Sequence, residues 1–533
     1  MSSVTPPAKA PGLAVEVVPV PPGDRSALRS DVAGFLGRTR RGPLGPGATP
    51  SRVRVQGQRG FDTLFGPVIK GAFTPYAVNG YFQNDGQVAH VIRLCGPASR
   101  TATAIWDLSS LTAGAAQVEG GFKWSKFAFS ASSPGCWANG AQVTLTYSRQ
   151  GVSGTPAVDV VVRVKDEPPE IIRGIMPCKL ADQTSATSSL IRVANIEGSA
   201  LPNPVGLGSL TSTQSLTLKS GHDDPPTLQT YLDAIQSMGD EPEVAMVALP
   251  DLYHDLSANG DAESLLAAAI AQADHRHDRL VLVDVPPAKS ASQDIITWVE
   301  SLSQSSRDAN VLGTADTPRA AAVYHPWLWV PDPLGTTPDD SRLLLPPSGH
   351  VAGLISRLDR QRGAHFTPAN AALLQAFDVA QGFRAADRAV LNEARVNLIR
   401  CFSNQGLLVW GGRTLGIQPG DIFVAHRRLL HRLVRTIRAV AEPLVFDVNG
   451  PELWLTLVRA ITSMLLQAFR AGALAGSTPS EAFQVQCDDQ TNPPDEIDAG
   501  RVVCLVSVAP AVPMEFIVLR VTLDTEGRLE VLQ

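Results

Sequence analysis

The chain has 533 residues, of which 44% are hydrophobic and 18% are charged, and its formal net charge at pH 7 is -6. This length predicts several domains, and the hydrophobic content excludes a wholly disordered chain. The slightly acidic balance gives no overall attraction to nucleic acid or to anionic membranes, so an electrostatic partner would have to meet a local patch.

The cysteines and the apolar runs predict a cytoplasmic, soluble protein. No CxxC pair occurs, which argues against a zinc ribbon and against a disulfide scaffold. We expect reduced, mostly buried thiols at Cys95, Cys136, Cys178, Cys401, Cys487 and Cys504. The N-terminal MSSVTPPAKAPG has no apolar signal region, and no later stretch supplies the roughly 20 uninterrupted apolar residues of a membrane-spanning helix.

Residues 1–30 predict an extended arm. Prolines surround one alternating run, GLAVEVVPV. Because proline lacks the N–H that a sheet ladder needs, such a strand is expected to pair at a sheet edge. Residues 31–95 follow as a connector rich in Gly, Pro and Arg and as the start of an outer region. They run through FDTLFG and YAVNGYFQNDG to the strand AHVIRL.

The middle of the chain predicts two units of different character. Residues 96–180 contain the alternating runs FKWSKFAFSA, AQVTLTYS and AVDVVVRVKD, separated by turn residues, which predicts a β-rich outer module. In residues 181–344, helical patterns such as ESLLAAAIAQADHR alternate with apolar runs such as EVAMVALP and RLVLVDVP. That alternation predicts an α/β outer domain with a largely parallel sheet.

The last third predicts two long helices and two closing strands. In HRRLLHRLVRTIRAVAEPLV an apolar stripe is expected at Leu430, Leu433, Val434 and Ile437, and arginines fall largely on another face. This basic face is either solvated or turned toward an acidic partner. Nucleic acid is disfavoured because no aromatic residues interleave the arginines. The runs VVCLVSVA and EFIVLRVTL predict strands whose edges need a partner or a cover.

Two aspartates are the main candidates for chemistry. Asp251 and Asp284 follow predicted strands, where α/β enzymes place catalytic groups. No GxGxxG, GxxxxGK[ST] or GxSxG motif accompanies them, which favours a structural role. The run DHRHD at 274–278 places two histidines on different faces of a helix, so we expect a solvated helix end and no metal site. We predict no catalytic residue, cofactor or metal.

Several strings resemble contractile tail sheath proteins, the family of phage tails, R-type pyocins and extracellular contractile injection systems. In the last third these strings are RGAHFTPAN, VNLIRCF, LLVWGGRTL and GSTPSEAFQVQCDDQTN. PGLAVEVVP, SSPGCWANGAQVTL and AAVYHPWLWVPDP resemble earlier parts of the family in the same order. The opening lacks the tyrosine and paired glutamates of many relatives, and TNPPDEID replaces the usual TNTxxDI.

The resemblance implies a mixed α+β, multi-domain sheath subunit. Its parts would be a conserved inner α/β domain at 345–512, β-rich and α/β outer domains inserted before it, and extended arms at 1–30 and 513–533. The implied function is structural, not enzymatic: stacked six-fold rings around an inner tube that contract and drive the tube through a target envelope. The alternative is an α/β enzyme that uses Asp251 and Asp284.

The resemblance also implies partners and contact residues. The partners are copies of the chain, the inner tube protein, and baseplate and terminal cap proteins, without nucleic acid or direct membrane insertion. Assembly would occur in the bacterial cytoplasm, as part of a phage tail or of a released or anchored particle. Strand pairing between subunits is expected at Leu13, Val15, Val17, Val18, Phe516, Val518, Arg520, Leu529 and Val531. A basic helix face toward the tube is expected at Arg428, Arg432, Arg435 and Arg438.

Overall fold

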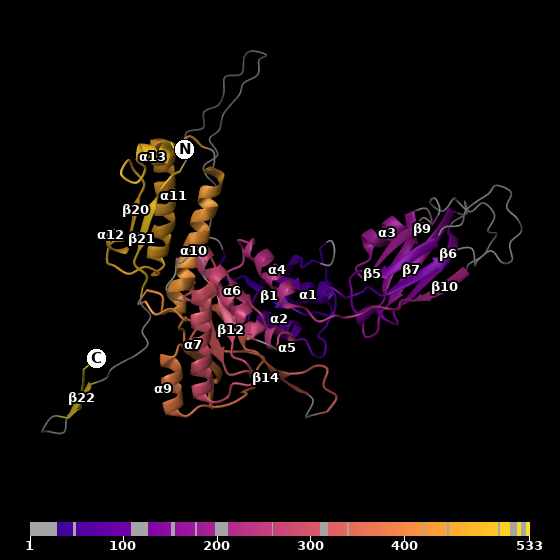
Figure 1. Ribbon diagram of the computed structural model, residues 1–533, viewed down its shortest axis with the longest axis horizontal. Helices are drawn as coiled ribbons and strands as arrows, with labels where there is room; N and C mark the ends of the chain where they lie inside the picture. The colour runs from indigo at the N-terminus through magenta and orange to yellow at the C-terminus, as the bar shows by residue number, and fades with distance from the viewer. Residues whose placement is uncertain are drawn as a thin grey trace, which may run out of the picture.

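The computed structural model in Figure 1 shows a central α/β body with a β lobe on one side and a helical C-terminal module on the other. The structure describes residues 29–45, 49–107, 126–150, 155–175, 179–197, 212–257, 260–309, 318–337, 341–418, 420–444, 447–498, 501–511, 520–523 and 529–532.

A nine-stranded sheet forms the centre of the body. The strands from β18 to β3 run parallel, and antiparallel pairs close both edges. Fully buried strands such as β12 fit a parallel sheet that is covered on both faces. In spatial order the strands are β16 (Ala371–Ala372), β19 (Gly406–Trp410), β18 (Val396–Phe402), β13 (Ala321–His325), β12 (Leu280–Asp284), β11 (Met246–Ala248), β1 (Ala33–Gly37), β3 (Val88–Arg93) and β2 (Arg52–Gln56).

Helices cover both faces of this sheet with two separate apolar cores. One core is formed with α4 (Leu228–Gly239), α5 (Leu252–Asp255), α6 (Asp261–Arg276), α7 (Ser292–Ala309) and α9 (Ala385–Glu393). The opposite core is formed with α1 (Gly57–Phe65), α2 (Thr74–Gln83), α8 (Ser348–Arg362) and the start of α10 (Val424–Ala441). A small sheet joins β15 (Arg342–Leu345), β14 (Leu328–Pro331) and β17 (Asp378–Val379).

The central sheet differs from the domain division expected from the sequence. Strands from 31–95, 181–344 and 345–512 are hydrogen-bonded side by side. The expected boundary at 344 therefore does not separate an outer α/β domain from an inner one, and 31–95 is part of the body rather than an outer connector. Local alternation identifies a strand but not its partners, which here come from distant segments.

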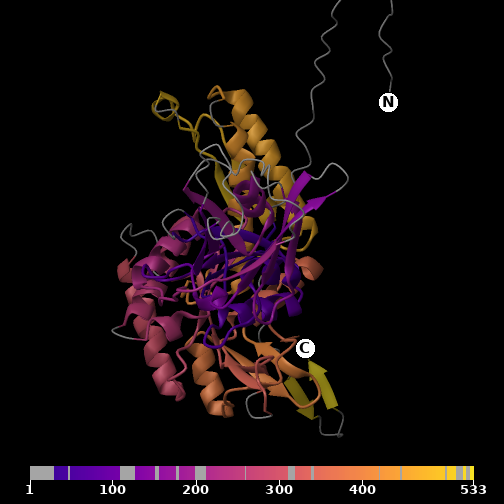
Figure 2. The same ribbon diagram turned by 90° about the vertical axis from the view of Figure 1, so that its right-hand side faces the viewer.

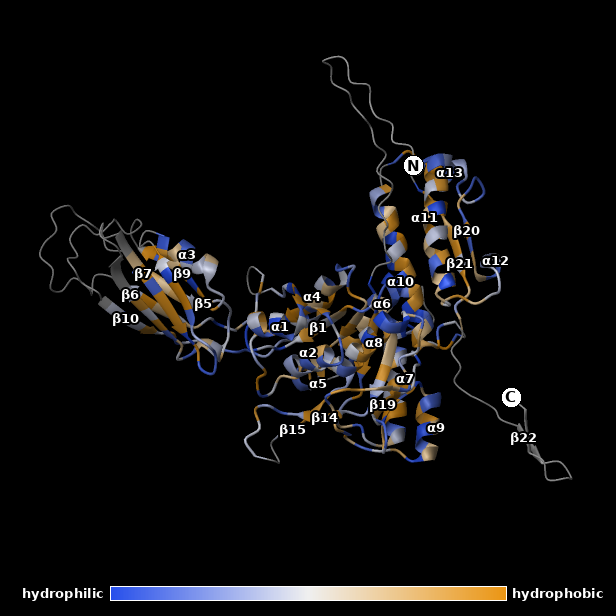
Figure 3. Ribbon diagram, turned by 180° about the vertical axis from the view of Figure 1, so that it is seen from behind, coloured by the Kyte–Doolittle hydropathy of each residue, from blue (hydrophilic) through white to orange (hydrophobic). Residues whose placement is uncertain are grey.

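The β lobe contains two packed sheets. One has the order β10 (Ser212–Thr217), β6 (Gln142–Gln150), β7 (Thr155–Arg163), β8 (Glu170–Ile175), and the other β4 (Thr103–Asp107), β5 (Lys126–Ala131), β9 (Ile191–Glu197). Their inner faces share one apolar core, which α3 (Leu180–Thr187) covers in part. Figure 3 shows the hydrophobic strands of this lobe apart from the body. The lobe extends past residue 180, the end expected from the sequence, because β9 and β10 belong to its sheets.

The C-terminal module packs on the far half of α10. It contains α11 (Pro451–Arg470), α12 (Pro479–Ala482), α13 (Pro494–Asp498) and the antiparallel pair β20 (Phe483–Gln486) and β21 (Leu505–Val508). Its core is small and apolar. A separate hairpin, β22 (Arg520–Leu523) and β23 (Leu529–Leu532), follows in sequence and lies apart from the module in Figures 1 and 2. Within the described ranges, every helix is too short or too polar to cross a membrane.

Candidate functional site

Asp251 connects three backbone segments. Its side chain is fully buried after β11. It accepts the amide hydrogens of Arg38, at 2.8 Å, of Thr74, at 3.3 Å, and of Phe73. These donors lie after β1 and at the start of α2. All are main-chain groups within the fold, so the arrangement is that of a structural clamp.

Asp284 connects β12 to the first residue of α8. Its carboxylate accepts the amide hydrogen of Ser348 at 2.9 Å. Burial raises the pKa of Asp284 to about 7.

A groove of about 390 Å³ lies elsewhere, between α7 and α9, and is lined by Glu300, Arg307, Glu393 and Arg395 among others. Neither Asp251 nor Asp284 lines it, which gives the enzyme alternative no support.

The arginines of α10 do not form the exposed face that was expected. Arg428 is 3% exposed and donates to Asp359 Oδ1 at 2.6 Å and to the carbonyl of Ser30 at 2.9 Å. Arg435 is 2% exposed and donates to the carbonyl of Glu243 at 3.1 Å. The prediction that Arg428 and Arg435 face a tube is therefore wrong, because both side chains face the body of their own chain.

The remaining two arginines of that prediction lie nearer the surface. Arg432 is half-buried. Arg438 has a 52% exposed side chain, which pairs with Asp278 at 3.1 Å. On the other side of α10, Leu429 and Leu433 pack with α11. Helix α10 thus has two covered faces, one in the body and one in the C-terminal module.

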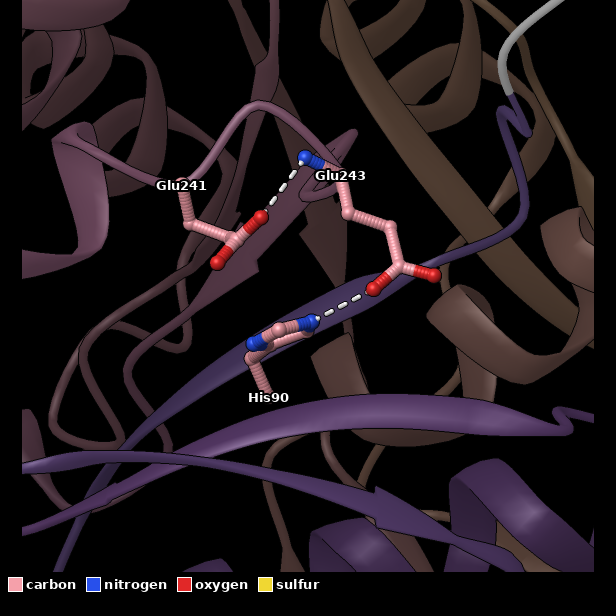
Figure 4. A group of neighbouring side chains, drawn as sticks. All are labelled: His90, Glu241 and Glu243. Atoms are coloured by element: carbon pink, nitrogen blue, oxygen red, sulfur yellow. Dashed lines mark hydrogen bonds and ion pairs between the residues drawn. The ribbon is translucent and has the colours of Figure 1, made fainter.

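Figure 4 shows a cluster that the sequence analysis missed, formed by His90, Glu241 and Glu243. His90 Nε2 lies 2.9 Å from the Glu243 carboxylate, and the Glu241 carboxylate accepts the amide hydrogen of Glu243 at 3.1 Å. The three side chains could each offer one ligand atom to a metal ion. The sequence does not reveal this cluster, because β3 and the loop before β11 are about 150 residues apart in the chain.

Arginines already satisfy the carboxylates of this cluster. Arg54 donates to both oxygens of Glu243, at 2.9 and 3.1 Å, and Arg52 pairs with Glu241 at 3.1 Å. The hydrogen bond from Arg54 is the chief cause that lowers the pKa of Glu243 to about 2. A cation would have to displace these guanidinium groups, so the arrangement favours a salt-bridge network that ties β2 and β3 to the loop before β11.

The DHRHD segment is less solvated than expected. Asp274 is buried and accepts the amide hydrogen of Ala320 at 2.8 Å. Asp278 is also buried and pairs with Arg279 at 2.7 Å. His277 ends α6 with a φ of 53°. The expectation of a solvated helix end is wrong for the aspartates, because Asp274 ties α6 to the residue before β13 and Asp278 holds the turn into β12.

Most of the residues expected to pair between subunits lie outside the described part of the chain: Leu13, Val15, Val17, Val18, Phe516 and Val518. Arg520, Leu529 and Val531 lie in the hairpin, where β22 and β23 pair with each other in the register Arg520↔Leu532.

The cysteines also differ from expectation, since Cys136 and Cys401 are exposed and only Cys487 is buried among the five described.

Comparisons with known sequences point to one family. The family model described as phage tail sheath protein central domain matches residues 225–415. The tail sheath protein of Vibrio phage KVP40 is 24% identical over 397 residues, which cover 70% of this chain and 56% of that protein. The tail sheath protein of Salmonella phage ViI is 24% identical over 231 residues, 42% and 33% of the two chains. The chain thus spans about half or less of these curated relatives.

Solved structures share the fold over nearly the whole chain. The helical sheath of the anti-feeding prophage in its contracted state has 21% identity and a TM-score of 0.57, and the match covers 97% of this chain and 99% of that one. A sheath tail protein from Listeria innocua has 11% identity and a TM-score of 0.59, with 91% and 96% covered. The family-model match over residues 225–415 and the curated relatives thus make the chain similar to contractile tail sheath proteins, and the solved sheath structures share its fold.

Proposed function

We propose that the protein is a structural subunit of a contractile tail sheath. Subunits stack as six-fold rings around an inner tube and contract to drive the tube through a target envelope. The observation that carries this proposal is the extent of the shared fold, since the match to one contracted sheath subunit covers 97% of this chain and 99% of that one. Outer lobe, central body and C-terminal module are therefore included in one sheath-like arrangement.

The enzyme alternative has a structural explanation for each of its candidate residues. The carboxyl groups of Asp251 and Asp284 both accept hydrogen bonds from main-chain amides, and these bonds connect β1, α2 and α8 to the ends of β11 and β12. A buried carboxyl group whose partners are main-chain amides is positioned to join segments of the fold. These contacts support a role without catalysis.

The proposal includes strand pairing between subunits through the terminal arms. The sheet of β20 and β21 is two-stranded and lies in the small C-terminal module. Such a sheet is marginal alone, and further strands added at its edges would extend the ladder. The arm positions proposed to supply them are Leu13, Val15, Val17 and Val18 at one end, and Phe516, Val518, Arg520, Leu529 and Val531 at the other.

The partners in this account are copies of the chain, an inner tube protein, and baseplate and terminal cap proteins. The particle would be assembled in the bacterial cytoplasm, as a phage tail or as a released or anchored injection device. Two solved neighbours are baseplate structures of the anti-feeding prophage, which agrees with a place next to a baseplate.

Substitutions in the N-terminal arm test this assembly mode. Charged residues at Val15 and Val17, introduced as Val15→Asp with Val17→Asp, should abolish fast-sedimenting polymers while circular dichroism shows an intact fold. Charges on alternating positions remove the apolar side of an added strand. Thr5→Asp, outside the alternating run, serves as the control and should leave polymers unchanged. Normal polymers from the double variant would contradict pairing through this arm.

A further inference from the structure

Two free cysteines face each other at the end of the β20–β21 ladder. The strands are antiparallel, with Gln486 opposite Leu505. Cys487 follows β20 and Cys504 precedes β21, so the same register, continued by one residue, places them opposite each other. Both thiols are free.

The orientation of the neighbouring backbone defines what kind of pair this is. The N–H and C=O of Val503 both face Asn492, in the connection from β20, at 2.6 and 3.0 Å. Ala509 N donates to Ala482 O, just before β20, at 2.9 Å. In the segment that contains β21, the N–H and C=O groups of odd-numbered residues thus point toward β20 and its connection, and those of Cys504 point away. Cys487 and Cys504 therefore occupy a non-hydrogen-bonded position, where Cα atoms lie about 4.5 Å apart.

The two thiols are close enough for each to affect the pKa of the other. Asn492, which is 1% exposed, donates from Nδ2 to the sulfur of Cys487 at 3.6 Å. A disulfide needs a Cα separation of about 4.4–6.8 Å and facing Cβ atoms, and a directly opposed strand pair meets the first condition without movement of the backbone.

We propose that Cys487 and Cys504 form a reversible cross-strand disulfide when the protein meets an oxidising small-molecule disulfide. Cys504, half-buried, is the entry point. Its thiolate attacks one sulfur of the reagent and releases one thiolate. The Cys487 thiolate then attacks the mixed disulfide at the Cys504 sulfur and releases the second. The two protein thiols are oxidised, and one reagent disulfide is reduced to two thiols. This inference does not depend on the proposed sheath function.

The surroundings make this reaction slow. Burial raises the pKa of Cys487, and the charge of Asp488 raises it further. Burial also raises the pKa of Cys504, to about 11. Little thiolate is therefore present at neutral pH. The pair is expected to stay reduced in a reducing cytoplasm and to close over hours outside it, fixing the register of a sheet that is otherwise only two strands wide.

The test uses the full chain with excess oxidised glutathione at pH 8.5, followed by alkylation of free thiols, digestion and mass spectrometry. The expected product is a peptide pair joined through Cys487 and Cys504, which a reductant separates. Cys504→Ser should leave Cys487 without this partner. Cys401→Ser, which removes an exposed thiol, should leave the joined pair unchanged.

Hydrogen exchange gives a second readout of the same event. Oxidation should slow exchange in β20 and β21 by about tenfold or more, because the cross-link limits opening of the ladder. The central sheet should not respond. Separate alkylation of Cys487 and Cys504 in oxidised, folded wild-type protein would overturn the inference. So would an equal yield of cross-links from either residue to Cys401.

Discussion

Buried charged side chains hold together backbone segments that are far apart in the sequence. Arg279 is 1% exposed and donates to the carbonyls of Met238 and Gly239, at 2.6 and 2.9 Å, while it pairs with Asp278. A guanidinium group has five donors in a fixed geometry, so it can satisfy several main-chain carbonyls at once. Such residues resemble surface charges in the sequence because their partners lie on other elements.

The raised pKa of Asp284 predicts that the stability of the protein depends on pH. Its pKa is about 7 in the folded protein and near 3.8 in the unfolded chain, so the folded state binds more protons between these values. The free energy of unfolding should therefore fall as pH rises from about 4 to about 7 and then level off. Asp284→Asn keeps an acceptor for Ser348 but carries no charge. It should be equal to wild type near pH 4 and more stable at pH 8, by at most about 4 kcal/mol.

Chemical denaturation at pH 4 and pH 8 measures this difference. Asp308→Asn, on an exposed turn of α7, is the control and should show no such pH-dependent gain. If Asp284→Asn destabilises the protein equally at both pH values, the buried charge is not the source of the effect.

The ion pair of Arg428 and Asp359 predicts that substitutions of these two residues have non-additive effects on the free energy of unfolding. The two side chains are each 3% exposed. Arg428→Met leaves a buried carboxylate unpaired, so it should cost about 3–5 kcal/mol in the free energy of unfolding. Adding Asp359→Leu should recover most of that loss, because no buried charge is then left without a partner. A double-mutant cycle measured by urea denaturation gives the coupling. An Arg428→Met variant of wild-type stability would restore the idea of an exposed, partner-facing arginine.

At the scale of elements, α10 shows which features the sequence could predict. The 3.6-residue pattern indicated a helix with an apolar and a basic face, and both are present. The pattern could not say what covers each face, because Asp359 of α8 and the carbonyl of Glu243 lie 69 and 192 residues away. Likewise β1 follows a proline-rich segment but pairs between β3 and β11, as the third strand from one edge of the sheet.

The β lobe is expected to be separable from the body. Its two connections to the body pair with each other, since Arg100 forms an antiparallel bridge with His222. Replacing residues 101–221 by Asn-Gly, which closes a two-residue turn, should therefore leave a folded α/β body. Far-UV circular dichroism and a cooperative thermal transition measure this. Removal of β1, a strand inside the sheet, is the control and should abolish folding. Aggregation of both variants alike would mean that the lobe is part of the body's folding unit.

At the scale of the whole molecule, the proposed contraction needs no nucleotide or cofactor to supply energy. A metastable extended lattice that relaxes to a more stable packing of the same surfaces releases free energy with every subunit. Within one chain, α10 joins the central body to the C-terminal module: Arg428 and Arg435 bond to the body, and Leu429 and Leu433 pack in the module. This connection suits a subunit that rotates as a unit while its terminal arms keep contact with neighbours.

Electron microscopy of the full-length protein, expressed with its inner tube protein, tests the central claim most directly. The expected result is helical tubes built of stacked six-fold rings, with two lattices of different diameter and length before and after contraction. Deleting residues 1–20 or 513–533 should remove the tubes. Discrete particles of a few subunits that never form rings or tubes, with the tube protein present, would contradict this claim.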